Sequence, residues 1–242
     1  MTEDLAPFRA IELSDDLDIR IEKGPSESVS IEADDNLVDI LKFKVENGTL
    51  VISSFYNITS KKTLNIVVTY TELDAITITN GLLTMNDVIT SDGLDVNASG
   101  TARLILNASA NVITINMDGN SSGDFNVASD DLNLTFKDRI DAKVYATGEN
   151  HSLFMYKNAS VKMEGSTELL TAKIYGSSTL KAAEFLANKV VLISEDSPDV
   201  YIQAVQELDL SAKGASKTSL YGNPKITITD FLDTSQLQKE NN

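Results

Sequence analysis

Leu-Asp-Val-Asn-Ala-Ser-Gly-Thr-Ala-Arg-Leu-Ile-Leu, residues 94–106, is the stretch of sequence that decides the fold. Two apolar residues separated by one polar residue, Leu94 and Val96, precede a turn at Gly100, and a second apolar pair follows the turn. The same arrangement recurs around Gly119, which lies 19 residues further along the chain. Alternating apolar residues are typical of half-buried strands, and self-similarity at a fixed period indicates a repeat architecture.

The repeat extends from about residue 73 to residue 229. We expect turn centres near Gly81, Gly100, Gly119, Asp138, Asn158, Ser177, Asp196 and Gly214. One coil of this size cannot close a core, but stacked coils can, because each apolar pair lies on its neighbour at a spacing of about 4.8 Å. The sequence therefore predicts an all-β protein, a right-handed parallel β-helix (solenoid) with coils of about 19–20 residues.

The rest of the chain predicts a leading section and a tail around these coils. Residues 1–72 contain short alternating runs and an Asn47-Gly48 hairpin signal, and are expected to form a β-rich capping section of the same domain. Residues 73–229 form the coils, and residues 230–242 form a C-terminal tail that is either a cap or disordered. Leu180–Ala187 has the composition of a short helix, but it falls on the period of the repeat and is assigned to a coil.

Composition narrows the classes of partner. The 242 residues include 36 acidic and 20 basic side chains, a net charge of −16, which disfavours nucleic acid as a partner. No run of 18 apolar residues is present, so we expect no transmembrane helix. The absence of cysteine excludes disulfides and thiol chemistry.

Several segments resemble one known family. The opening Phe8–Leu13 and Leu17–Gly24, the block Asp35–Leu37 with Glu46–Ile52, and the closing Ser219–Ile226 are similar to the GIN-domain "putative auto-transporter adhesin head" family. The resemblance covers about residues 8–229. It implies a right-handed β-helix that is usually exported, is common in Bacteroidetes-type bacteria and has no catalytic residues to carry over.

Residues that could do chemistry are few. His151 is the only histidine, so a Ser-His-Asp triad would have to use it, and we expect it instead to be a surface turn residue. One histidine and no cysteine predict no metal site and no cofactor. Adjacent acids such as Asp130/Asp131 and Glu195/Asp196 are expected to be solvated turns rather than glycosidase carboxylates.

Basic and aromatic residues supply the candidate binding positions. Arg103, Lys143, Lys162 and Lys181 lie near matching repeat positions and could line one face, either in a groove or as solvated outward residues. Tyr156 with Tyr175, and Tyr201 with Tyr221, lie one coil apart and are expected to stack. These four tyrosines are the ligand-binding candidates if they are exposed, and packing elements of the solenoid if they are not.

These patterns favour a non-enzymatic exported or cell-surface scaffold, a putative adhesion or binding module. Its expected partner is a cell-surface glycan or a protein. The alternative is a polysaccharide lyase or hydrolase on a β-helix. Because stacked rods have open ends, a homo-oligomer is a further expectation. The acidic start Met1–Asp4 lacks a signal pattern, so export to the periplasm, outer membrane or surface would require a leader before Met1.

Overall fold

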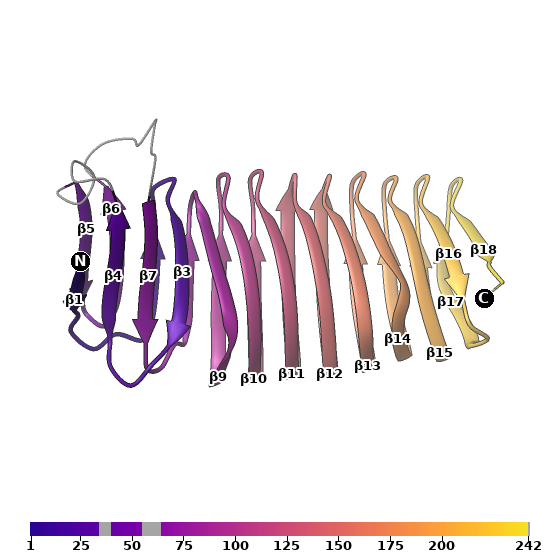
Figure 1. Ribbon diagram of the computed structural model, residues 1–242. Helices are drawn as coiled ribbons and strands as arrows, with labels where there is room; N and C mark the ends of the chain where they lie inside the picture. The colour runs from indigo at the N-terminus through magenta and orange to yellow at the C-terminus, as the bar shows by residue number, and fades with distance from the viewer. Residues whose placement is uncertain (34–39, 55–63, 242) are drawn as a thin grey trace.

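The structure is a computed structural model, and it describes residues 1–33, 40–54 and 64–241. Within these ranges the regular structure is entirely β, and there is no helix of the length and apolar character needed to cross a membrane. Hydrogen bonds join all the strands into one continuous sheet that winds into an elongated solenoid (Figure 1). The strands are β1 (Thr2–Asp4), β2 (Ala10–Leu13), β3 (Asp18–Lys23), β4 (Ser28–Ala33), β5 (Leu41–Glu46), β6 (Thr49–Ser54), β7 (Leu64–Tyr70), β8 (Ala75–Ile78), β9 (Leu82–Ala98), β10 (Arg103–Met117), β11 (Ser122–Asp138), β12 (Asp141–Lys157), β13 (Ser160–Ile174), β14 (Thr179–Ser194), β15 (Asp199–Ala212), β16 (Lys217–Tyr221), β17 (Lys225–Phe231) and β18 (Gln236–Lys239).

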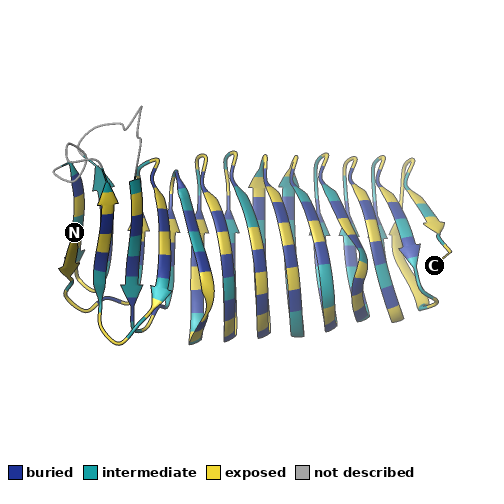
Figure 2. Cartoon of the chain, viewed as in Figure 1, coloured by how far each residue is buried: buried dark blue, intermediate teal, exposed yellow. Residues whose placement is uncertain are grey.

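Each long strand from β9 to β15 is one coil. Neighbouring coils pair in parallel, so that Arg103 lies beside Ser122, and Ser122 beside Asp141. Within β10 the alternation of buried and exposed residues slips by one position at Asn111–Val112, where the ladder also skips a pair. Apolar side chains stay buried on both sides of this slip, so the chain must bend there. A coil is therefore a first half-strand and a second half-strand, with their inner faces packed together (Figure 2).

The corners between coils share one backbone feature. A residue with positive φ occurs in each of nine corners: Gly81, Gly100, Gly119, Asp138, Lys157, Gly176, Asp196, Gly214 and Asp233. Two of the predicted turn centres, Asn158 and Ser177, are one residue too late, because Lys157 (φ 66°) and Gly176 (φ 72°) adopt the left-handed conformation instead. Asn and Ser are commoner turn residues than Lys, which is why the sequence pointed to Asn158.

The N-terminal end of the solenoid is closed by the leading section. β2 and β3 stack in parallel on β8 and β9, while β6 and β7 lie on their opposite edges. Three antiparallel pairs, β1 with β4, β4 with β7 and β5 with β6, complete this end, and the hairpin predicted at Asn47-Gly48 joins β5 to β6. Asp35–Leu37 lies outside the described residues. The predicted division of the chain at residue 72 stays a prediction.

The C-terminal end has a different construction. β16 and β17 stack on the two halves of β15, and β18 begins a further coil by pairing with β16. The tail, expected to be a cap or disordered, therefore contains a strand that continues the parallel ladder. Along β17 every residue is exposed (Figure 2). The predicted fold class, a parallel β-helix, is confirmed.

Candidate functional site

Three lysines of successive coils lie directly side by side. Lys143 on β12 pairs in register with Lys162 on β13, which pairs with Lys181 on β14, and Lys181 pairs with Tyr201 on β15. All four side chains point outward from the first half-strands and are exposed. We name these four residues, together with Tyr145 in the adjacent row, the lysine–tyrosine face. The predicted alignment of these lysines is confirmed, whereas Arg103 lies in the neighbouring row, two residues away from their register.

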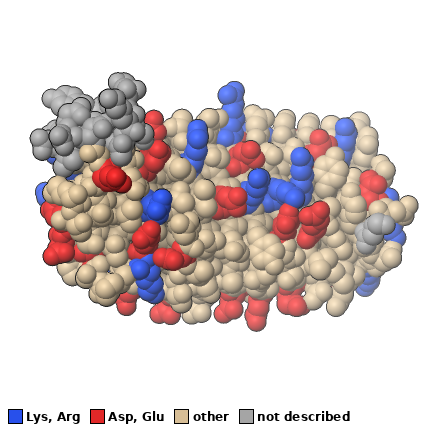
Figure 3. All heavy atoms as spheres, in the orientation of Figure 1, with Lys and Arg blue, Asp and Glu red and all other residues tan. Residues whose placement is uncertain are grey.

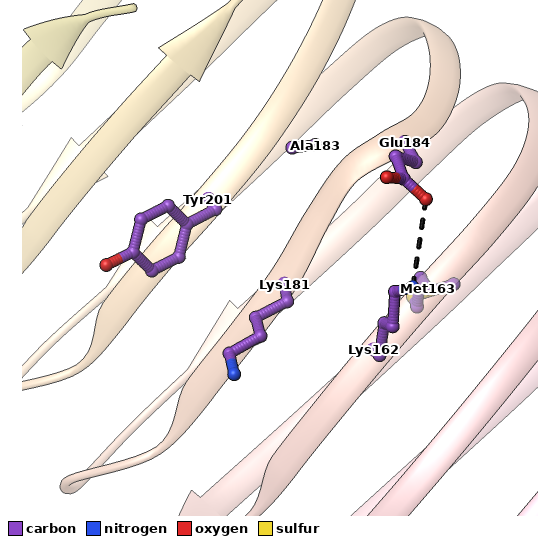
Figure 4. Close-up of a pocket in the computed structure, with 6 residues that line it drawn as sticks. All are labelled: Lys162, Met163, Lys181, Ala183, Glu184 and Tyr201. Atoms are coloured by element: carbon purple, nitrogen blue, oxygen red, sulfur yellow. Dashed lines mark ion pairs between the residues drawn. The ribbon is translucent and has the colours of Figure 1, made fainter.

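A shift of register in β14 hollows this face. Between Ala182 and Leu186 the strand carries extra residues relative to β15, so Glu184 is pushed outward while Phe185 is fully buried. The resulting hollow has a volume of about 220 Å³ and is lined by Lys162, Met163, Lys181, Ala183, Glu184 and Tyr201 (Figure 4). The irregular strand therefore creates a concave spot on this face.

The hollow is one of a series. A second hollow, of about 300 Å³, shares Lys162 with the first and contains Lys143, Tyr145 and Glu164. A third, of about 340 Å³, shares Lys143 with the second and extends to Arg103. All three are shallow and lie on outward-facing first half-strands. Together they form a track that runs across the coils, along the length of the solenoid.

Charges on the track are closely interleaved. The Nζ of Lys162 lies 2.5 Å from the Oε1 of Glu164 and 3.8 Å from the Oε2 of Glu184. The hydrogen bond to Glu164 raises the pKa of Lys162 and lowers the pKa of Glu164, so both groups stay charged at neutral pH. Within the described residues no carboxylate lies at ion-pair distance from Lys181 or Lys143. Lys and Arg side chains gather over β12–β14 among acidic ones (Figure 3).

The four candidate tyrosines do not form one site. Tyr156 and Tyr175 stack as predicted, with ring centroids 5.1 Å apart and an interplanar angle of 13°, but Tyr156 lies on the second half-strand of β12 and Tyr175 directly follows that of β13. Tyr201 and Tyr221 do not stack, and that expectation is wrong: Tyr201 lies beside Ser219, and Tyr221 beside Gln203. Two residues separated by 20 positions are not in register here, because the corner residues that bound this coil, Asp196 and Gly214, are only 18 positions apart. The roles of these tyrosines in ligand binding stay predictions.

Tyr156 and Tyr175 belong to a small aromatic cluster of their own. Phe154 lies 6.3 Å from Tyr156 between ring centroids, and the Nζ of Lys173 lies 4.9 Å from the centroid of Phe154. All four side chains are half-buried. Mutual stacking covers part of the ring faces that a ligand would need, so this cluster is better suited to packing between coils than to binding.

His151 is not the surface turn residue that the sequence suggested. Its side chain is only 2 % exposed, and it occupies the inward row between Leu132 and Leu170 of the adjacent coils. Its ring centroid lies 5.8 Å from that of Phe185, and burial lowers its pKa to about 4. The polar run Glu149–Ser152 suggests a surface turn, but the slip in alternation at Glu149 and Asn150, which are both exposed, turns the side chain of residue 151 inward. Neither ring nitrogen has a hydrogen-bond partner among the described residues.

The acidic residues are distributed rather than clustered for chemistry. Across residues 1–33, 40–54 and 64–241, no group of three or more His, Asp or Glu side chains is arranged to hold a metal ion. Asp130 is exposed at a bend, and the carboxylate of Asp196 accepts a hydrogen bond from the Gly176 N–H at 3.0 Å. These contacts fit the expectation that the acids at corners are solvated and stabilise turns.

Comparisons with known proteins identify a family and a shared fold. The family model described as "Putative auto-transporter adhesin, head GIN domain" matches residues 7–126 and 112–224. A putative adhesin from Parabacteroides distasonis superposes with a TM-score of 0.73 at 13% identity, covering 98% of this chain and 95% of that one. A putative lipid binding protein from the same species has a TM-score of 0.67 at 18% identity, with coverages of 99% and 95%. A putative adhesin from Parabacteroides merdae has a TM-score of 0.67 at 13% identity, with the same coverages. A search of curated proteins finds no match.

Proposed function

Because this chain belongs to the family described as putative auto-transporter adhesin, head GIN domain, we propose that it is a non-enzymatic, exported binding module. Its partner in this proposal is a cell-surface glycan, held on the lysine–tyrosine face. The observation that carries the proposal is the track of joined hollows, in which the exposed rings of Tyr145 and Tyr201 flank three aligned lysines.

The chemistry of the track suits an uncharged sugar chain. Aromatic rings offer a flat apolar surface against which a sugar ring packs, and Lys181 offers hydrogen-bond donors beside the ring of Tyr201 (Figure 4). The Lys162–Glu164 and Lys162–Glu184 pairs present donors and acceptors together, with little net charge. A polyanion would meet these acids as well as the lysines, so a neutral chain that bonds to both is favoured.

The shape of the track also favours a sugar chain as the ligand. The three hollows are shallow and joined end to end, whereas sites for small molecules usually enclose most of the ligand. Rows on adjacent coils repeat at about 4.8 Å, so an extended chain crossing the coils meets similar contacts at each step. The track therefore fits several units of a polymer better than one isolated sugar.

The alternative function, polysaccharide cleavage, has weaker support at this face. A general acid or base works best with a pKa near the working pH. In the hollow, the contact between Lys162 and Glu164 moves both pKa values away from neutrality. The single histidine, which could otherwise serve, is buried in the core. These features favour binding without turnover.

A panel of neutral and acidic polysaccharides, measured by calorimetry and by release of reducing or unsaturated ends, tests the proposal. We expect a neutral polysaccharide to bind without release of new ends. Tyr201→Ala and Lys181→Ala should each weaken this binding about tenfold or more, which corresponds to ~1.4 kcal/mol. Tyr156→Ala, on the second half-strands, is the matched control and should leave the affinity unchanged.

Three results would contradict the proposal. Loss of binding in Tyr156→Ala but not in Tyr201→Ala would move the site to the aromatic cluster. Release of sugar ends that depends on Glu164 or Glu184 would establish the enzymatic alternative. Fractionation of the native host that finds the protein only in the cytosol would overturn export.

A further inference from the structure

The C-terminal end of the solenoid leaves its inner rows uncovered. In β15, Leu208 and Leu210 are fully buried, and the residues stacked on them in β17 are Ile226 and Ile228. Ile226 is 43% exposed and Ile228 is 51% exposed, because no strand lies beyond them. Phe231, stacked on the buried Ala212, is also 43% exposed. The last coil therefore exposes side chains that are core residues in every other coil.

The opposite end of the molecule does not share this exposure. There Val29 and Ile31 on β4 are buried, and the row through the buried Leu50 and Ile52 of β6 ends in Val45 and Phe43 on β5, which are half-buried. The antiparallel strands β1 and β5 pair with β4 and β6 at this end. A copy joined head to tail would have to place an open end against this closed one, so head-to-tail filaments are disfavoured.

An open strand edge accompanies the exposed apolar residues. β17 pairs with β15 along one edge, and its outer edge presents unpaired N–H and C=O groups. Exposed edges with apolar side chains pair readily with another strand, and repeat proteins normally cover the terminal unit. The C-terminal end of the solenoid therefore fits a partner that supplies both a strand and an apolar layer.

We propose that this partner is a second copy of the chain, joined end to end across a two-fold axis so that β17 of each copy lies antiparallel to β18 of the other, because β18 extends one coil beyond β17. The two copies then cover each other's Ile226, Ile228 and Phe231 and satisfy both open edges through one self-complementary contact. This arrangement places β18 of one copy at the free edge of β17 of the other, and it keeps the inward side chains of both copies on the inner side of the joined walls.

Charge supports a second copy of this acidic chain at this end. Residues 217–241 contain three lysines and three acids, Lys217, Lys225, Lys239, Asp230, Asp233 and Glu240, so the last coil carries no net charge. The whole chain carries −16. Two copies can therefore approach through these ends with less repulsion than through the more acidic remainder of the surface. Such a dimer goes beyond the proposed glycan binding, since it would display two lysine–tyrosine faces on one particle.

Light scattering coupled to size exclusion tests the pairing. The wild type at roughly 100 μM, far above a dissociation constant in the micromolar range, should show twice the monomer mass of 26.3 kDa. Ile228→Lys should shift it to the monomer mass. Val112→Lys is the matched control, because Val112 is a similarly exposed strand residue (41%) on a central coil, and this variant should stay dimeric. A monomeric wild type, or the same mass for both variants, would overturn the proposal.

Paired cysteines provide a test that does not depend on disrupting the end. The chain has no cysteine, so one introduced on β17 (positions 226–229) and one on β18 (positions 236–239) are the only two in each copy, and a disulfide between copies forms only where they lie within about 7 Å between Cα atoms. At least one pair, such as Thr227→Cys with Gln238→Cys, should give a covalent dimer on oxidation. Thr114→Cys with Gln238→Cys should not. If no pair cross-links two copies, a strand from a different protein becomes the better candidate for this end.

Discussion

At the scale of single residues, His151 replaces a leucine of the neighbouring coils inside the core. Leu132 and Leu170 flank it in register, and its imidazole contacts Phe185 instead of a polar partner. A buried imidazole without a partner is stable only in its neutral form. The residue therefore makes the stability of the solenoid sensitive to acid.

The sign of this effect follows from the two pKa values. Burial lowers the pKa of His151 from 6.5 to about 4, so the unfolded chain binds the proton more readily. Stability from this residue is full above pH 6.5 and is lost as the pH falls toward 4, by about 2 kcal/mol between pH 7.5 and pH 5. His151→Leu should remove this loss, measured as the difference in unfolding free energy between variant and wild type in urea at each pH. An equal pH dependence in both proteins would contradict it.

At the scale of elements, the corners rather than the strands limit which residues are allowed. Gly176 joins β13 to β14 with φ at 72°, and a Cβ there would lie 2.6 Å from the carbonyl oxygen of Lys157. Four other corners place Asp or Lys in the same conformation, so side chains are tolerated only where the neighbouring corner leaves space.

Substitution of two glycines separates these effects. Gly176→Ala should lower the free energy of unfolding by about 2 kcal/mol, because it combines left-handed strain with a close contact. Gly93→Ala, within β9, meets nothing closer than 3.9 Å and should change stability by less than about 0.5 kcal/mol. Chemical denaturation of both variants is the measurement. An equal decrease in the free energy of unfolding in both variants would show that the corner geometry does not limit which residues are allowed.

The strands themselves were largely predictable from the sequence, and their irregularities were not. Alternating apolar residues and regular turn signals predicted the coils, including the assignment of Leu180–Ala187 to a coil rather than a helix. The register shift at Ala182–Leu186 depends on Phe185 packing into the core near His151, a contact between residues more than one coil apart. No local pattern in the sequence carries that information, and the hollow lined by Ala183 and Glu184 depends on it.

At the scale of the whole molecule, the sequence predicted the stack of coils. It predicted neither the strand pairing at the two ends nor the distribution of side chains between the faces. Placing Tyr156 and Tyr201 on different faces requires the phase slip within each coil, which a search for pairs at i and i+2 does not reveal. The leading section was predicted as β-rich, but its stacking on β8 and β9 depends on pairing between residues more than 60 positions apart. Long-range pairing of this kind leaves no periodic signal.

The parallel ladder also determines how the molecule responds to mechanical load. The hydrogen bonds between coils run along the axis of the rod, so tension applied between the ends of the chain pulls these rows apart one coil at a time. Each released coil shortens the rod by about 4.8 Å and frees about 19 residues, or roughly 65 Å of extended chain. Single-molecule pulling should give successive extensions near this length, whereas one rupture of the whole rod would contradict it. A surface protein built in this way would lengthen under shear while its remaining coils stay folded.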